Sequence, residues 1–169
     1  MYALATKTTG LKPELHEVIE LTIRSVETGI YVSYKIKPEK PENYTQQVQD
    51  INGISAKAAE NFMPKDKASS MILESWSGLH VLGHNCIFDY QMLKATFGIE
   101  FVKTLYGVDF IDLLSEAQNF DLKLLKDGKK KLFKNYKLKT LCEALKIKYE
   151  EKTEALVGVY NALKNASNS

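Results

Sequence analysis

Asp89 combines an acidic side chain with a position that favours chemistry. Val81 and Leu82 end an apolar run that predicts a short buried strand, and Phe88 and Leu93 then follow at roughly helical spacing. The carboxylate is therefore expected in the first turn of a helix, directly after a strand. Folds of the α/β class place functional groups at such strand ends. The alternative is that Asp89 only stabilises the amino end of its helix through the helix dipole.

A resemblance to a known family begins at this motif. The run from His84 to Asp89 reads His-Asn-x-x-Phe-Asp after an apolar strand, and it resembles the second motif of the DnaQ-like (DEDDh) 3′–5′ exonucleases. The resemblance implies the ribonuclease H-like fold. Further segments resemble that family in the same order along nearly the whole chain, namely residues 8–11 (Thr-Thr-Gly-Leu), 16–21, 52–55 and 138–142.

The resemblance also implies a catalytic site, most of which this chain lacks. Members of the family hydrolyse a phosphodiester with two divalent ions held by carboxylates, and a histidine acts as general base. The family's first motif, Asp-x-Glu, corresponds here to Ala5 and Lys7. Its last motif, His-x-Ala-x-x-Asp, corresponds to Thr153 and Gly158, so only Asp89 keeps the family's residue type. We therefore expect a vestigial site with no catalytic residue, no bound metal and no cofactor, made of Ala5, Lys7, Asp89, Thr153 and Gly158.

Other carboxylates could replace a lost ligand, and the candidates are Glu17, Glu20, Asp109 and Glu154. Each of them can equally be a surface charge or a helix cap. A single replacement would still leave no general base, and Lys7 would add positive charge where a metal must bind. The alternative to a dead site is an active 3′–5′ exonuclease with a rearranged site, which would use Mg²⁺ or Mn²⁺.

Lys7 leads to a geometric prediction. Without metal, Asp89 would be a partly buried charge with no counter-ion, which is unfavourable. We expect the ammonium group of Lys7 to fill the space of the lost cations and to contact Asp89, which would lower the pKa of that carboxyl. The alternative is that Lys7 points to solvent, while Asp89 bonds only to backbone donors and to His84 or Asn85.

A lysine-rich segment, residues 123–139, offers a different chemistry. Lysines recur along it, Asp127 is its only acid, and aromatic residues lie between the lysines. This mixture of phosphate-neutralising and stacking side chains is typical of single-strand binding. The alternative is a solvated, mobile loop whose aromatic rings pack on the body of the protein. The nucleic-acid contacts expected from this segment are Lys129, Lys130, Lys131, Phe133, Lys134 and Tyr136.

Length and composition set the limits for these interpretations. The 169 residues predict one domain, residues 1–165, followed by a polar tail, residues 166–169. A formal net charge of +2 is too small to indicate a nucleic-acid binder by itself. Cys86 and Cys142 lack C-x-x-C spacing, which favours a reducing compartment over a disulfide framework or a metal site. No signal-like or membrane-length apolar run occurs, so we expect a cytoplasmic protein without a membrane partner.

The elements that must position these residues follow from the pattern. Alternating residues 17–26 and 30–36 flank a Thr-Gly pair and predict a β-hairpin, and residues 1–6 add a third strand. A further strand is expected over residues 105–110. The expected helices cover residues 56–62 (capped by Ser55), 66–76 (capped by Asp66), 111–120, 138–145 and 152–165, and a further helix that carries Phe88, Leu93 and Phe97 is expected after the turn at residues 83–85. This order predicts an α/β protein with a mixed sheet, an antiparallel meander plus parallel strands, and helices on both faces.

The function that follows is a catalytically dead DnaQ-like exonuclease-fold domain retained for binding. Its expected partner is single-stranded nucleic acid, bound through residues 123–139, or alternatively a protein assembly. Neither composition nor motif decides between the two.

Overall fold

A five-stranded mixed sheet forms the centre of the structure, a computed structural model that describes residues 1–167. The strand order is β3-β2-β1-β4-β5. β1, β2 and β3 are antiparallel, whereas β4 and β5 run parallel to β1. The predicted antiparallel meander with added parallel strands is therefore confirmed. The strands are β1 (Tyr2–Thr8), β2 (Val18–Ser25), β3 (Tyr31–Lys35), β4 (Leu79–Gly83) and β5 (Tyr106–Asp112).

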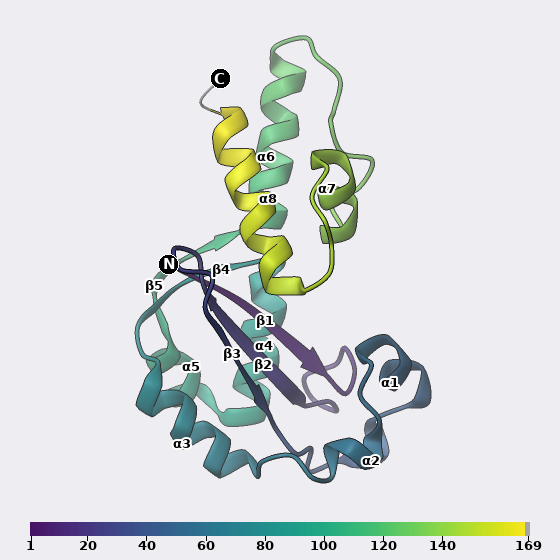
Figure 1. Cartoon of the computed structure of the whole chain (residues 1–169), viewed down its shortest axis with the longest axis vertical. Coiled ribbons are helices and arrows are strands. Elements are labelled where there is room, and N and C mark those ends of the chain that lie inside the picture. Colours follow the sequence, from purple (N-terminus) through teal and green to yellow (C-terminus); the bar gives the residue numbers. More distant parts are fainter. Residues whose placement is uncertain (168–169) are drawn as a thin grey trace.

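Helices cover both faces of this sheet, as predicted (Figure 1). One face packs against α3, α4 and α5, and the other against α6, α7 and α8. Figure 1 shows α6, α7 and α8 gathered at one end of the molecule, with α3 and α5 at the opposite end. The helices are α1 (Gln46–Asn52), α2 (Ala56–Ala59), α3 (Lys65–Ser75), α4 (Cys86–Phe97), α5 (Ile99–Leu105), α6 (Leu113–Lys126), α7 (Leu138–Leu145) and α8 (Lys152–Ser167), with a short 3-10 turn at Pro41–Asn43.

Strand alternation divides the core into two clusters. Successive side chains of a strand point to opposite faces, so Leu4 joins the cluster under α3, α4 and α5, while Ala3 joins the cluster under α8. The same division separates Val81 from Leu82 in β4. Because both faces are buried here, β1 and β4 read as apolar runs rather than as alternating strands.

Turn and cap residues explain where several elements begin. Gly29, between β2 and β3, has φ +72°, a conformation that glycine adopts without steric cost. The Ser55 hydroxyl accepts a hydrogen bond from the Ala58 N–H at 3.1 Å, which confirms the predicted cap of α2. Asp112 caps α6 by accepting from the Leu114 N–H, so that helix begins two residues later than expected.

Three expectations about the helices were wrong. Pro64, not Asp66, occupies the N-cap of α3, and Asp66 lies in its first turn. Helices α1 and α5 were not predicted, because each is a single short stretch of two turns whose apolar pattern blends into its neighbours. Helix α8 continues to Ser167, through the first part of the expected polar tail. The remaining two tail residues lie outside the described residues.

Candidate functional site

A cleft of about 350 Å³ lies over the antiparallel strands, at the start of α8. The strand register builds its floor from three cross-strand rows, which are Ala3–Arg24–Tyr31, Ala5–Thr22–Ser33 and Lys7–Glu20–Lys35. The middle row consists of small side chains, whereas Arg24 and Tyr31 on one side of it and Lys7, Glu20 and Lys35 on the other have long ones. The cleft is therefore the space left above the middle row. Residues 150–152, immediately before and at the start of α8, form its wall.

Arg24 ties this floor to the start of α8. Its guanidinium lies 3.1 Å from the Glu151 carboxylate and donates to the Thr153 hydroxyl at 3.0 Å. A third bond from the same group reaches the Gly29 carbonyl at 2.8 Å, in the turn between β2 and β3. Burial alone would raise the pKa of Glu151, but hydrogen bonds from Thr153, Glu154 and Arg24 outweigh it and lower that pKa. Glu151 is thus an ionised partner of Arg24.

Asp89 lies in the first turn of α4, as predicted, and is only 2% exposed. Its Oδ1 accepts two hydrogen bonds from Thr6, one from the backbone N–H at 3.0 Å and one from the hydroxyl at 2.6 Å. Burial raises the pKa of the Asp89 carboxyl, although the charge of Lys152 and the bonds from Thr6 act in the opposite direction. The carboxylate therefore joins α4 to β1 and is turned away from solvent.

The predicted contact between Lys7 and Asp89 is wrong. Lys7 Nζ lies 3.2 Å from Glu20 Oε1, its cross-strand neighbour. Thr6 and Lys7 are adjacent in a strand, so their side chains project from opposite faces, and Thr6 is the residue that meets the helix carrying Asp89. The expected lowering of the Asp89 pKa is also wrong, because burial has the larger effect. A lysine does act on Asp89 electrostatically, but it is Lys152.

The two positions in α8 that the sequence assigned to a vestigial site, Thr153 and Gly158, lie outside the cleft lining. Thr153 is fully buried and bonded to Arg24 and Glu151. A Cβ atom added to Gly158 would lie 2.9 Å from Ile147 Cγ2, so a larger residue there would require Ile147 to move. Neither position contributes an acid or a base to the cleft.

The donor set does not fit a pair of divalent ions. Hard cations such as Mg²⁺ need several oxygen ligands, chiefly carboxylates. Of the carboxylates near the cleft, Glu20 pairs with Lys7, Glu151 with Arg24, and Glu150 with Lys148 at 2.6 Å. Within residues 1–167, no group of three or more histidine, cysteine, aspartate or glutamate side chains is arranged to hold a metal ion.

The remaining carboxylates considered from the sequence have other roles. Glu17 is buried and accepts a hydrogen bond from the Lys40 N–H at 2.8 Å. Asp109 and Glu154 are exposed. The acid that closes β5 is Asp112, which accepts from the Asn85 N–H at 2.6 Å and so fixes the turn before α4. The four candidates therefore do not converge with Asp89.

Sequence reasoning missed the residues that shape the cleft. Arg24 and Tyr31 lie opposite each other in the predicted hairpin, and that pairing was available from the alternation and the Gly29 turn. Lys152 was assigned only to a helix start. The charged run of residues 148–152 was the signal that could have drawn attention to this wall.

The lysine-rich segment is held against the body of the protein by Asp121. This buried carboxylate accepts from the Leu132 N–H at 2.7 Å and from the Tyr136 hydroxyl at 3.1 Å. Phe133 is 4% exposed and packs in the cluster under α6, α7 and α8. The expectation that Phe133 offers a stacking face is therefore wrong, because its ring fills the core. The lysines at positions 129–131 and 134 are exposed, so their predicted contact with nucleic acid stays a prediction.

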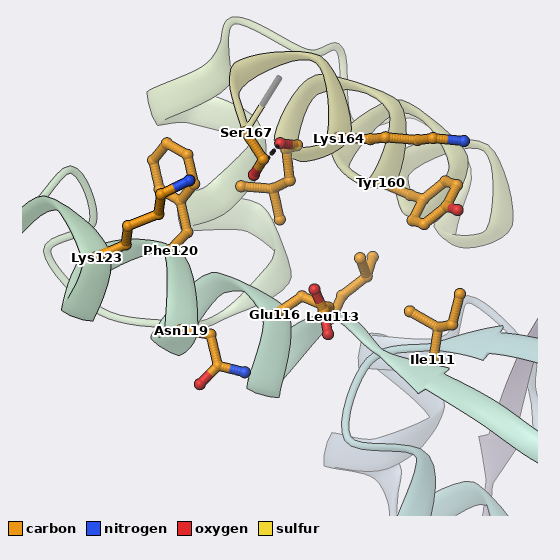
Figure 2. A pocket seen from close by; sticks show the side chains of 10 residues that line it. Ile111, Leu113, Glu116, Asn119, Phe120, Lys123, Tyr160, Lys164 and Ser167 are labelled. Atoms are coloured by element: carbon orange, nitrogen blue, oxygen red, sulfur yellow. Dashed lines mark hydrogen bonds between the residues drawn. The ribbon is translucent and has the colours of Figure 1, made fainter. Parts of the chain in front are cut away.

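A second cavity, of about 410 Å³, lies between α6 and α8 (Figure 2). Figure 2 shows Tyr160, Lys164 and Ser167 of α8 across from Glu116, Asn119 and Phe120 of α6, with Ile111 and Leu113 at one end. The Lys164 ammonium lies 5.9 Å from the centroid of the Tyr160 ring. None of the five positions that the sequence assigned to a vestigial site lines this cavity. It is separate from the cleft over the antiparallel strands.

In the part of the chain that the structure describes, none of the helices has the length and apolar character needed to cross a membrane.

Comparisons with known proteins agree with the fold described above. A family model described as RNase_T, Exonuclease, matches residues 6–163. A comparison with curated proteins gave no match. Among solved structures, a product-bound exonuclease I superimposes with a TM-score of 0.79 at 16% identity, covering 97% of this chain and 43% of that one.

Two further exonuclease I structures are similar. The enzyme from Methylocaldum szegediense gives a TM-score of 0.72 at 17% identity, over 99% of this chain and 41% of that one. The E. coli enzyme in complex with a 5cy-dA13 oligonucleotide gives 0.74 at 16% identity, over 97% and 40%. This chain thus spans less than half the length of these proteins. The likeness confirms the predicted ribonuclease H-like mixed sheet.

Proposed function

The chain belongs to the exonuclease family described by the RNase_T model, within the DnaQ-like superfamily, and on this premise we propose that it is a catalytically inactive member retained for binding. The observation that carries the proposal is the state of Asp89. It is the one acid retained of the family's set, and it is buried against Thr6 rather than presented to the cleft.

The neighbouring positions support the same conclusion. Ala5 provides no metal ligand. Lys7 places its ammonium group beside Glu20, so the negative charge of that carboxylate is already neutralised by a lysine and attracts a metal ion less. Two Mg²⁺ ions would add repulsion with Lys7 and Lys152 at short range. Thr153 has no basic nitrogen with which to accept a proton from water. Neither the metal pair nor the general base of the family's chemistry is provided.

Single-stranded nucleic acid is the ligand class that we propose for this binding role. Exposed lysines at positions 129–131 and 134 carry positive charge toward solvent, which attracts a polyanion without a requirement for sequence. Solved exonuclease I structures include complexes with an oligonucleotide and with SSB-Ct. A protein assembly is therefore the outcome to expect if strands do not bind.

Both cysteines are free and buried, which supports a reducing, cytoplasmic location.

A nuclease assay tests the loss of catalysis. The purified chain is incubated with a 5′-labelled single strand and Mg²⁺ or Mn²⁺, beside the variant Asp89→Asn as a matched control. We expect no shortening of the strand in either sample. A metal-dependent ladder from the unchanged chain that disappears in the variant would establish the rearranged active site instead. An equal ladder in both would come from a contaminating nuclease, and the assay is then repeated on repurified protein.

A further inference from the structure

We propose that a small cavity between the start of α4 and the outer strand β5 binds a neutral molecule with a single aromatic ring and one acceptor for the Tyr106 hydroxyl. The cavity has a volume of about 130 Å³ and is lined by Cys86, Ile87, Tyr90, Tyr106 and Phe110. It shares no lining residue with the cleft over the antiparallel strands or with the cavity between α6 and α8. The inference therefore goes beyond the proposed function and does not depend on it.

An irregularity in the pairing of β5 brings two aromatic rings together at this place. In the parallel register Leu79 pairs with Tyr106 and Val81 with Phe110, so three residues of β5 lie opposite a single residue of β4. Leu79, Val81 and Tyr106 all belong to the core cluster under α3, α4 and α5. Tyr106 and Phe110 are therefore neighbours on the face that α4 covers, as residues two apart are in a regular strand.

The first two turns of α4 form the opposite wall. Ile87 and Tyr90 are three residues apart, so their side chains share one side of the helix. The Tyr90 ring packs edge-on against the Tyr106 ring, with 5.5 Å between the centroids and 77° between the planes. The buried Cys86 thiol donates to the Ile111 carbonyl at 3.5 Å, so its hydrogen is already used. The walls are thus held by the helix, the strand and their mutual packing.

The Tyr106 hydroxyl is the observation that points to a ligand. Tyr106 is only 9% exposed, and its hydroxyl has no hydrogen-bond partner among the described residues. Buried polar groups are unfavourable when they stay unpaired, and most of them in folded proteins have a partner. A ligand that accepts a hydrogen bond at this point would therefore gain affinity from a group that the fold itself leaves unsatisfied.

This hydroxyl remains a donor at neutral pH. Burial, followed by the charge of Asp89, raises the pKa of the Tyr106 hydroxyl well above 10, so it keeps its proton. Cys86 and Tyr90 also act on this pKa, and both of them line the cavity. The hydroxyl therefore lies on the side of the ring where the cavity is. The matching group on a ligand is an acceptor such as a carbonyl oxygen.

Size and charge define the rest of the ligand. An apolar cavity of roughly 150 Å³ holds one benzene molecule, and this cavity is only slightly smaller. None of its five lining side chains is cationic, and the charges of Asp112 and Asp89 already act on Cys86. A carboxylate or phosphate is therefore disfavoured. The class that fits is a neutral ring with one carbonyl oxygen, as in an aryl ketone or an aryl amide.

The ligand can enter past two exposed apolar side chains. Ile87 is 56% exposed and Phe110 is 54% exposed, although both line the cavity. Exposed apolar groups beside a hollow are typical of ligand-binding grooves. A water molecule is a weaker occupant, because a buried water needs about three polar partners and these walls consist mostly of rings and aliphatic carbon.

A titration followed by ¹H–¹⁵N NMR spectra tests the inference with acetophenone as the probe. Ethylbenzene is the matched ligand, because it has the same ring and a similar size but no acceptor. We expect saturable shifts of the backbone amides of Ile87, Tyr90 and Phe110. Acetophenone should bind about 2- to 13-fold more tightly than ethylbenzene, as one net hydrogen bond predicts. Benzoate, which is anionic, should bind more weakly than acetophenone.

Two variants separate the hydroxyl from the space around it. Tyr106→Phe keeps the ring and removes the unpaired hydroxyl, so it should fold normally and bind acetophenone and ethylbenzene equally. Ile87→Trp places a larger side chain at the opening and should abolish binding of both ligands. The control is Ile51→Trp, the same substitution at an exposed residue of α1 away from the cavity. That variant should bind like the unchanged chain.

Three results would overturn the inference. These are equal affinity of the unchanged chain for acetophenone and ethylbenzene, a preference for acetophenone that persists in Tyr106→Phe, and the absence of saturable shifts at the cavity. An ordered water on the hydroxyl would give the first of these results. None of them bears on strand binding or on catalysis, so the proposed function would stand.

Discussion

Asp89 is held in surroundings that stabilise its neutral form. Burial raises the pKa of its carboxyl above the value of about 3.9 that an unfolded chain gives. Between that value and the raised folded pKa, the folded state binds more protons than the unfolded state. The free energy of unfolding therefore falls as pH rises through this window, and remains lower above it. The buried carboxyl group of Asp89 would thus lower stability at neutral pH.

The variant Asp89→Asn tests this interpretation at the residue scale. Its amide oxygen can keep both hydrogen bonds from Thr6 without a buried charge. We expect the free energy of unfolding at neutral pH to equal or exceed that of the unchanged chain, with a smaller decline above pH ~4. Asp89→Ala, which leaves the Thr6 N–H unsatisfied, should lose about 1–3 kcal/mol. Urea unfolding followed across pH measures all three proteins.

A different outcome would assign Asp89 a different state. If Asp89→Asn were less stable and its deficit grew with pH, the carboxylate would be ionised in the fold and stabilised by Lys152. Lys152→Gln would then show the same deficit.

At the scale of elements, the hairpin and its neighbours could be predicted because alternation and turn residues are local signals. β2 and β3 are predicted from their pattern and from Gly29, and α7 from its apolar spacing. The site depended on register instead. A shift by one residue turns every side chain to the other face, and this decided that Thr6 rather than Lys7 meets Asp89. The composition of β1 alone does not say which of its two faces meets Asp89.

The order of the segment over residues 123–139 could not be predicted from its own sequence pattern. Its lysines suggested a mobile loop, but a single buried acid, Asp121, orders its backbone from within α6. Asp121 looks like any surface acid in the sequence. Its partners lie more than ten residues away, so local pattern does not reveal the pairing.

Neutralising part of this segment is the element-scale prediction. Replacing Lys129, Lys130 and Lys131 with Gln should weaken single-strand binding for all sequences and flatten its salt dependence. Removing the neutralisation of one phosphate should reduce the slope of log K against log salt by about 0.7. Anisotropy titrations at several salt concentrations measure the slope. An unchanged slope would show that these lysines take no part, and Lys103→Gln provides the control, because Lys103 is exposed and pairs with Glu100 outside this segment.

At the scale of the whole molecule, the fold was predictable because segments resembling the family occur in order along the chain. The family match over residues 6–163 and the strand order agree with that prediction. The residue types Ala5, Lys7, Thr153 and Gly158, at positions where the resemblance implies acids and a base, were also visible in the sequence. The hydrogen-bond partners of Asp89 were not visible in the sequence, since they depend on the three-dimensional packing of α4 against β1.

Insensitivity to divalent metal is the whole-molecule prediction. A ligand that binds only the folded state raises the melting temperature as its occupancy increases. With no fitting donor set among the described residues, millimolar Mg²⁺ or Mn²⁺ should leave the melting temperature equal to that in a chelator. Differential scanning calorimetry makes the comparison, with a monovalent salt added to the chelator sample to equalise ionic strength. A metal-specific rise that Asp89→Asn abolishes would refute the prediction.

The shared packing of β1 and α8 has a consequence for the order of events during synthesis. Ala3 and Leu163 belong to one buried cluster, although nearly the whole domain separates them in sequence. A ribosome adds about 5–20 residues per second, so roughly 8–32 s pass between the synthesis of β1 and that of the helix that covers its apolar face. During that interval the nascent chain exposes a sheet surface that invites association with other chains. We expect the half-made domain to need a chaperone more than the finished one does.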